Sequence, residues 1–372
     1  MSDQNGNMKT IELHENGLDI QFRIRENGVV ELADLSSQEV KKAAMEPKED
    51  IYYPAVEIHR SGTGSLNMHA YKNNINQSSV DFVYEKHELK EQDGGKELEI
   101  VMVSPEKLKA VYHMRLFDGV PAVQTWTEIT NEGSEDQGLT YVSSFIYQGI
   151  SRGGNKPYYK KTDIYVPFNS WCCEAQWQKY DAETLNLNGM VVDGFNHQGY
   201  GLNRYCYSGK GTWSTCEYLP MGIAEDRETG ETYIFQVESS GQWLIEYGSA
   251  QGGNLYLTIS GATEQEHGWY KNLKPGECFI TVPAGAAVVK GGLNPAVAAL
   301  TRYRRKVRRA NPDDEKLNVV FNDYMNCLMG DPTTERELSI IDKAAELGCE
   351  YYCLDAGWYD DGFWWDRVGE WK

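Results

Sequence analysis

The chain has 372 residues, of which 41% are hydrophobic and 24% are charged, as in folded globular proteins and unlike disordered ones. Its 55 acidic and 36 basic residues give a formal net charge of −19. A surface that negative repels nucleic acid and anionic membranes, so we expect neither as a partner. No apolar run approaches the roughly 18 residues of a membrane-spanning helix, and the N-terminus has no hydrophobic signal core. We therefore expect a cytoplasmic protein.

Cysteine and histidine spacing gives no sign of a metal site. The 8 cysteines contain no CxxC pair, and the 7 histidines show no HxH or HxxxH spacing. Free thiols in a reducing compartment are the better interpretation. We expect no metal and no cofactor.

Up to about residue 293, short apolar runs alternate with polar residues, which is the period of half-buried strands. Leu18 to Ile24 is one such run, and Asn27-Gly28 after it predicts a type I′ hairpin turn. The same pattern recurs as far as Leu255 to Ile259, and no helix-length apolar period interrupts it. We expect residues 1–293 to form one large antiparallel sandwich.

The period changes at Asn294. We predict Asn294 as the N-cap and Pro295 as the first residue of a helix over roughly 295–309, with an apolar face that includes Leu300. The helix over 294–310 is expected to link two domains.

Residues 311–372 follow a β, α, β pattern. The apolar run Leu317 to Phe321 predicts a strand buried on both faces. A capping box beginning at Thr334 predicts a helix that ends at Gly348, and Glu350 to Leu354 is the next strand. A parallel pair buried on both faces needs further strands and helices. A (β/α)8 barrel of ~250 residues would provide them, so we expect a truncated chain.

Functional side chains of parallel α/β folds lie just beyond the carboxyl ends of strands. Asp323 and Tyr324 follow the carboxyl end of the first predicted strand, and Asp355 and Trp358 follow that of the second. Carboxylates bind sugar hydroxyls through charge-assisted hydrogen bonds, and indole faces stack on sugar rings. From Leu317 onward the chain has 12 acidic and 4 basic residues. This negative local charge favours a neutral polyol over an anionic ligand.

These motifs resemble a known family. Asn322-Asp323-Tyr324, Leu354-Asp355-Ala356-Gly357-Trp358-Tyr359 and Gly369-Glu370-Trp371 resemble the start of the catalytic barrel of glycoside hydrolase family 36. That family holds α-galactosidases and related α-N-acetylgalactosaminidases. The run Trp126 to Gly133 is similar to part of its N-terminal β-supersandwich. The resemblance implies a β-supersandwich, a linking helix and then the first βα units of a truncated (β/α)8 barrel.

The family also implies an activity. Its members are retaining enzymes with an aspartate nucleophile and an aspartate acid/base. The resemblance therefore implies cleavage of terminal α-galactosides of oligosaccharides. The family's nucleophile lies in a Lys-x-Asp run, and no such run follows Leu317. We expect no catalytic residue in this chain, and we expect the chain alone to be inactive. The substrate-binding residues that the resemblance implies are Asp355, Trp358, Tyr324, Asp323 and Trp371.

Three departures from the family pattern leave alternatives open. Ala356 stands where many α-galactosidases have a second aspartate, and Tyr324 stands where many have tryptophan. The run Gly62 to Ser65 lacks an acid that reaches a neighbouring subunit's site in some tetrameric members. An α-N-acetylgalactosaminidase therefore stays an alternative, and a homo-oligomer is neither predicted nor excluded. A non-catalytic carbohydrate-binding β-sandwich protein is the alternative from another functional class.

Overall fold

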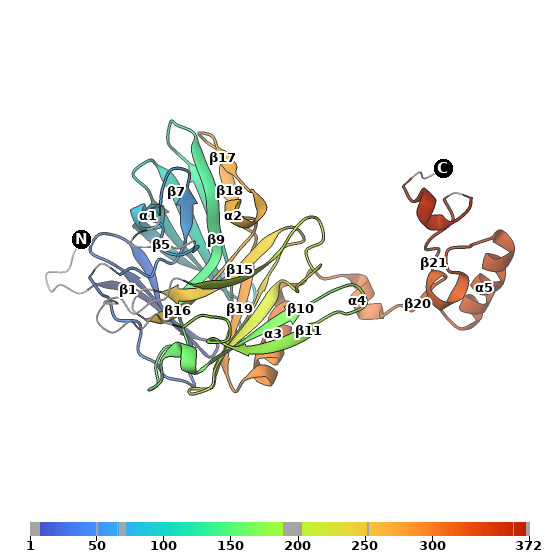
Figure 1. The fold of residues 1–372 in the computed structure, drawn as a ribbon, viewed down its shortest axis with the longest axis horizontal. Coiled ribbons are helices and arrows are strands. Elements are labelled where there is room, and N and C mark those ends of the chain that lie inside the picture. Colours follow the sequence, from blue (N-terminus) through green and yellow to red (C-terminus); the bar gives the residue numbers. More distant parts are fainter. Residues whose placement is uncertain are drawn as a thin grey trace. The chain divides into compact units, whose positions relative to one another are not determined.

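The computed structural model describes residues 8–49, 51–64, 66, 72–188, 203–250, 253–359 and 361–369. The chain forms two compact units, Met1–Val307 and Arg308–Lys372 (Figure 1). We call them the sandwich unit and the C-terminal unit. The first consists almost entirely of strands, whereas the second mixes helices with two short strands.

The strands of the sandwich unit follow one another along the chain as β1 (Lys9–Glu15), β2 (Leu18–Ile24), β3 (Val30–Ser37), β4 (Ile58–Arg60), β5 (Val83–Gln92), β6 (Gly95–Val103), β7 (Leu108–Phe117), β8 (Val120–Asn131), β9 (Gln137–Ile150), β10 (Thr162–Phe168), β11 (Gln176–Asp181), β12 (Arg204–Gly209), β13 (Met221–Asp226), β14 (Glu231–Val237), β15 (Trp243–Ala250), β16 (Asn254–Ser260), β17 (Lys271–Leu273), β18 (Cys278–Ile280) and β19 (Ala284–Lys290). Its helices are α1 (Gln77–Asp81), α2 (Glu264–His267) and α3 (Leu293–Val307).

In the described residues these strands form three sheets. A ten-stranded sheet has the order β11-β10-β13-β14-β19-β8-β7-β6-β5, with β18 also paired to β8. A six-stranded sheet has the order β12-β15-β16-β9-β17, with β4 also paired to β9, and β1-β2-β3 form a third sheet. Each strand pairing described within these three sheets is antiparallel. The predicted antiparallel sandwich is confirmed.

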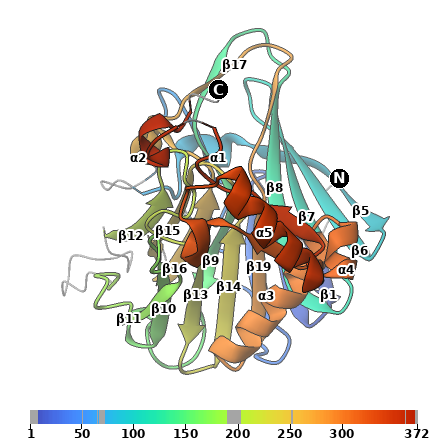
Figure 2. The same ribbon diagram turned by 90° about the vertical axis from the view of Figure 1, so that its right-hand side faces the viewer.

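The ten-stranded sheet shows why its strands have a period of two. On β14, Tyr233 and Phe235 point into the main core with residues of the other sheets, whereas Ile234 points to the opposite face. That opposite face is covered by α3, which lies beside β14 and β19 (Figure 2). Because α3 covers only part of the sheet, β6 and β7 carry polar side chains on the same outer face.

Helix α3 packs on the sandwich unit through Ala299, Leu300 and Tyr303, which contact Ile234 and other apolar side chains of the sheet. It begins at Leu293, so the prediction of Asn294 as its N-cap is wrong. The physical reason is that the amide of Ala296 already donates to the carbonyl of Gly292 at 3.3 Å, which brings Asn294 inside the first turn.

The turn between β2 and β3 also differs from the prediction. The amide of Gly28 donates to the carbonyl of Arg25 at 2.9 Å, and Gly28 rather than Asn27 has a positive φ, of 88°. A type I′ turn needs a positive φ at both central residues, so that prediction is wrong. Glycine is still required, because it takes the left-handed position at the end of the turn.

The C-terminal unit contains α4 (Pro312–Lys316), β20 (Val320–Asn322), α5 (Thr334–Glu346) and β21 (Tyr351–Cys353) (Figure 1). Strands β20 and β21 are parallel, with Phe321 opposite Tyr352. The N-cap of α5 is Thr333, whose hydroxyl accepts from the amide of Arg336, so the predicted capping box at Thr334 is wrong by one residue.

Strand β20 is less covered than the sequence predicts. Val319 and Val320 are 54% and 59% exposed, so the expectation of a strand buried on both faces is wrong for the described residues. The reason is that, within the described part of the chain, β20 pairs only with β21. No helix among the described residues combines the length and the apolar character that crossing a bilayer requires.

Candidate functional site

The carboxyl ends of β20 and β21 bring two polar side chains together. Asn322 ends β20, and Asp355 follows β21 by two residues. The amide Nδ2 of Asn322 donates to Oδ2 of Asp355 at 2.8 Å, and Oδ1 of Asn322 accepts from the backbone amide of Tyr324 at 2.8 Å. Asn322 is therefore held by its own loop, and through it the Asp355 carboxylate is held on an exposed edge.

Asp323 lies on the other side of this edge. It is only 1% exposed, and its Oδ1 accepts from the backbone amide of Asp355 at 2.8 Å. Its own amide donates to the carbonyl of Cys353 at 3.2 Å. Asp323 therefore joins the two strand ends from within, which fits a residue that positions Asp355 better than one that contacts a ligand.

A third acidic residue, which the sequence did not single out as a site residue, belongs to this cluster. Glu337 of α5 is 8% exposed and accepts from the hydroxyl of Tyr352 at 2.5 Å. Burial raises the pKa of Glu337, and the neighbouring carboxylate of Asp323 raises it further, against the opposite effect of Tyr352. Glu337 therefore belongs to the same acidic cluster as Asp323.

The aromatic residues lie around the same edge. Trp358 is about half exposed, and its Nε1 donates to the carbonyl of Asp355 at 3.0 Å. Tyr324 contacts the ring of Trp364 edge to face, with centroids 5.5 Å apart. Trp371, the fifth predicted site residue, lies outside the described residues. The structure thus brings Asp355, Trp358 and the Asn322 amide together, with Tyr324 on the adjoining loop.

Gly357 allows the loop after β21 to pass close to another backbone segment. Its φ is 93°, and a Cβ at this position would lie 2.1 Å from the carbonyl oxygen of Gly330 and 2.8 Å from Cδ of Pro332. No other residue type fits without moving this backbone. The close approach directs Trp358 next to Asp355, so the Gly357-Trp358 pair of the motif has a local structural cause.

The C-terminal unit exposes many large apolar side chains. Those most exposed, each by more than half, are Leu317, Val319, Val320, Met325, Met329, Leu338, Leu347, Tyr351, Trp358, Phe363 and Trp365. In the C-terminal unit these side chains include Val319 and Val320 at strand β20, which the sequence pattern predicts to be buried.

No protein-family model matches the chain. Among curated proteins it is 27% identical over 205 residues to the α-galactosidase Mel36A of Lactobacillus acidophilus, which covers 52% of this chain and 27% of that protein. It is 28% identical over 137 residues to the α-galactosidase AgaA of Geobacillus stearothermophilus, covering 37% of this chain and 18% of that protein. The resemblance to glycoside hydrolase family 36 is confirmed.

Solved structures agree on the fold. The family 36 α-galactosidase AgaA of Geobacillus stearothermophilus superposes with a TM-score of 0.71 at 17% identity, covering 95% of this chain and 50% of that one. AgaB of the same organism gives 0.71 at 17% identity, covering 97% and 51%. The fold is that of the N-terminal sandwich domain of family 36 enzymes. This chain spans about half the length of the structures it matches.

Proposed function

We propose that this chain forms the N-terminal β-supersandwich and the beginning of the catalytic barrel of a retaining glycoside hydrolase that cleaves terminal α-galactosides. In this proposal residues 1–293 are the sandwich, 294–310 the linking helix and 311–372 the first part of the barrel. The observation that carries the proposal is the Asn322–Asp355 hydrogen bond at the carboxyl ends of two adjacent parallel strands. Such strand ends carry the active sites of α/β barrels.

The chemistry of this edge suits a sugar. A carboxylate has about four lone-pair sites, so Asp355 can accept from sugar hydroxyls while it accepts from Asn322. Bonds from hydroxyls to an ionised carboxylate are about twice as strong as neutral ones. The exposed indole of Trp358 next to it can stack on the apolar face of a pyranose ring. We propose that Asp355 and Trp358 contact the sugar directly and that Asp323 positions Asp355.

The barrel part of the proposal is supported by the apolar surface of the C-terminal unit. Parallel strands are found almost only with both faces covered by helices and neighbouring strands. Val320 of β20 and the preceding Val319 are each more than half exposed to solvent in the described part of the chain. Further barrel units would cover them and would also supply the nucleophile and the acid/base. For this reason we propose that the chain alone is inactive.

The substrate and the compartment are also proposals. The AgaA structures include complexes with raffinose and with stachyose, so these α-galactosyl oligosaccharides are the first substrates to assay. The eight cysteines are free thiols and five of them are exposed, which suits the reducing cytoplasm.

The test is a substrate comparison on the complete gene product that contains this chain. Hydrolysis of p-nitrophenyl α-galactoside and raffinose, with little turnover of p-nitrophenyl α-N-acetylgalactosaminide, would support the proposal. The reverse preference would assign the α-N-acetylgalactosaminidase alternative. Binding of raffinose without turnover of any of the three would assign the non-catalytic carbohydrate-binding alternative and overturn the proposal.

A further inference from the structure

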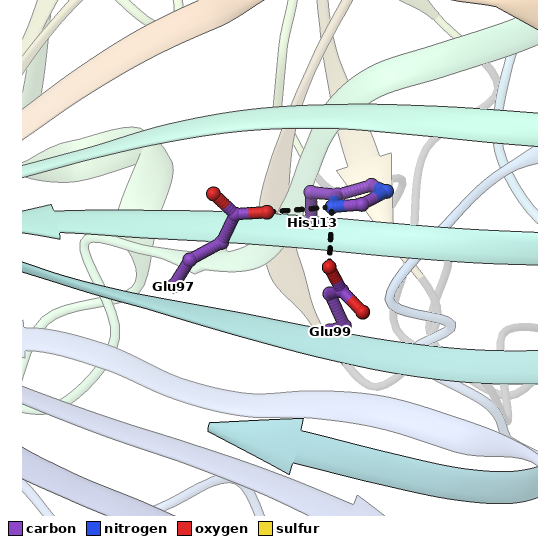
Figure 3. A group of neighbouring side chains, drawn as sticks. All are labelled: Glu97, Glu99 and His113. Atoms are coloured by element: carbon purple, nitrogen blue, oxygen red, sulfur yellow. Dashed lines mark hydrogen bonds and ion pairs between the residues drawn. The ribbon is translucent and has the colours of Figure 1, made fainter. Parts of the chain in front are cut away.

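A second cluster of charged side chains lies on the sandwich unit, outside the site described above. Glu97 and Glu99 belong to β6, and His113 belongs to the neighbouring β7 (Figure 3). Leu98 and Ile100 of β6 are in the main core, so Glu97 and Glu99 share the outer face of the ten-stranded sheet. The strand register sets Glu99 directly opposite His113.

The three side chains converge on one ring nitrogen. Nδ1 of His113 lies 3.0 Å from Oε1 of Glu97 and 3.8 Å from Oε1 of Glu99 (Figure 3). Although it lies on the outer face, His113 is only 7% exposed, because Trp126 stacks on its ring with centroids 4.6 Å apart and planes 7° apart. The imidazole is therefore fixed in the orientation that directs Nδ1 at both carboxylates.

The other ring nitrogen supplies an independent observation. Nε2 of His113 is buried and has no hydrogen-bond partner within the described part of the chain, and it lies 3.6 Å from Oε1 of Glu128. A neutral imidazole has one N–H. If the proton is on Nδ1, the lone pair of Nε2 faces Glu128. If it is on Nε2, the lone pair of Nδ1 faces two carboxylates. A cation bound at Nδ1 removes this conflict.

We propose that Glu97, Glu99 and His113 bind a divalent transition-metal ion, and that zinc is the ion that fits best. Zinc accepts imidazole nitrogen and carboxylate oxygen as ligands, and three protein ligands leave the fourth tetrahedral position for water. Tetrahedral bonds of ~2.0–2.2 Å separate ligand atoms by roughly 3.3–3.6 Å. The observed 3.0 and 3.8 Å lie on either side of that range. Nε2–H would then point at Glu128, as metal-bound histidines usually direct their second nitrogen at a carboxylate.

One neighbour competes for the site. Nζ of Lys90 lies 2.6 Å from the same Oε1 of Glu99. Lys90 is at the surface, with its side chain 36% exposed, so it can turn away when an ion binds. The bound ion would then join β6 to β7 at a part of the sheet that α3 does not cover. Sequence spacing could not reveal this site, since the ligands come from two strands whose register is unknown beforehand.

The test uses the full chain after treatment with a chelator, and the probe is zinc chloride alone in isothermal titration calorimetry. We expect one ion per chain. Glu97→Gln and His113→Gln abolish binding, and Glu128→Gln weakens it about 10- to 100-fold. Glu91→Gln, a change at an exposed residue of β5 whose ion-pair partner is Lys96, binds zinc as the wild type does. Melting temperatures of all variants without metal show whether each still folds.

A titration with cobalt distinguishes metal binding at this site from metal binding at exposed thiols such as Cys172 and Cys173. Binding at the proposed site gives cobalt d–d bands without a sulfur-to-cobalt charge-transfer band. The proposal is overturned if zinc does not saturate a site, if folded Glu97→Gln binds like the wild type, or if the cobalt spectrum shows thiolate ligation. Absence of binding would assign the cluster to contacts between the imidazole of His113 and the three neighbouring carboxylates alone.

Discussion

The side-chain amide of Asn322 donates a hydrogen bond to Oδ2 of Asp355 at 2.8 Å, between residues 33 positions apart in the chain. This bond joins the carboxyl ends of β20 and β21, while Asp323 accepts from the Asp355 amide on the buried side. Asp355 is thus held through both its side chain and its backbone. The proposed role of Asp355 in sugar binding leads to the first prediction.

Asp355→Asn in the complete gene product should lower kcat/KM about ten- to a hundredfold. The change keeps the shape and an acceptor for Asn322 but removes the charge, and hydrogen bonds to charged groups contribute roughly 1.5–3 kcal/mol. Asp355 is exposed, so the melting temperature should stay nearly constant. Asp342→Asn, an exposed change on α5, is the matched control. If Asp355 only caps a turn, the variant will melt lower with kcat/KM per folded molecule unchanged.

Glu337→Gln should alter how stability depends on pH. A raised carboxyl pKa means that the folded state holds the proton more tightly than the unfolded state. That stabilisation is complete below the unfolded pKa of about 4.3 and is lost as the pH rises through the folded value. Glutamine stays neutral, so Glu337→Gln should gain stability relative to the wild type as the pH rises above the unfolded pKa of about 4.3.

The gain should grow over the pH range in which the folded wild type loses the proton of Glu337, because the wild type loses its stabilisation there and the glutamine variant does not. Thermal unfolding of the full chain across this pH range measures it. Glu335→Gln changes an exposed residue of the same helix. Its melting temperature should depend on pH as that of the wild type does. A constant difference between Glu337→Gln and the wild type at every pH would contradict the protonated state of Glu337.

Much of the fold was predictable because burial on one face of a sheet imposes a period of two. Tyr233 and Phe235 of β14 follow it and lie together in the main core. The candidate site was less predictable. Asp355 was found from its place after a strand, but Glu337 was not, because its role depends on how α5 packs against Tyr352. The exposure of Val320 likewise depends on neighbours that no local pattern describes.

Gly357→Ala should destabilise the C-terminal unit more than Gly362→Ala. Both glycines have a φ above 90°, at 93° and 94°, so alanine at either position costs about 1–3 kcal/mol in backbone strain. Only at Gly357 would the new Cβ also meet a backbone oxygen, that of Gly330 at 2.1 Å. Thermal unfolding of both variants measures the difference. Equal melting temperatures would mean that the close approach at Gly330 does not constrain the loop.

Leu300→Ala should cost the sandwich unit roughly 2–5 kcal/mol, the usual range for a buried leucine. Leu300 lies in the core between α3 and the ten-stranded sheet. Val297 on the same helix is 45% exposed, so Val297→Ala should change stability by less than about 1 kcal/mol. Urea unfolding of the full chain gives both values. Similar small losses for the two variants would mean that α3 does not depend on the sandwich for its packing.

The most direct test of the proposed function is the rate of p-nitrophenyl α-galactoside hydrolysis by two proteins, the chain of residues 1–372 alone and the complete gene product that contains it. We predict turnover by the complete product and none above background by the chain alone, because a retaining mechanism needs two carboxylates that we expect outside this chain. Turnover by the chain alone that is lost when one of its own carboxylates is changed would contradict this prediction.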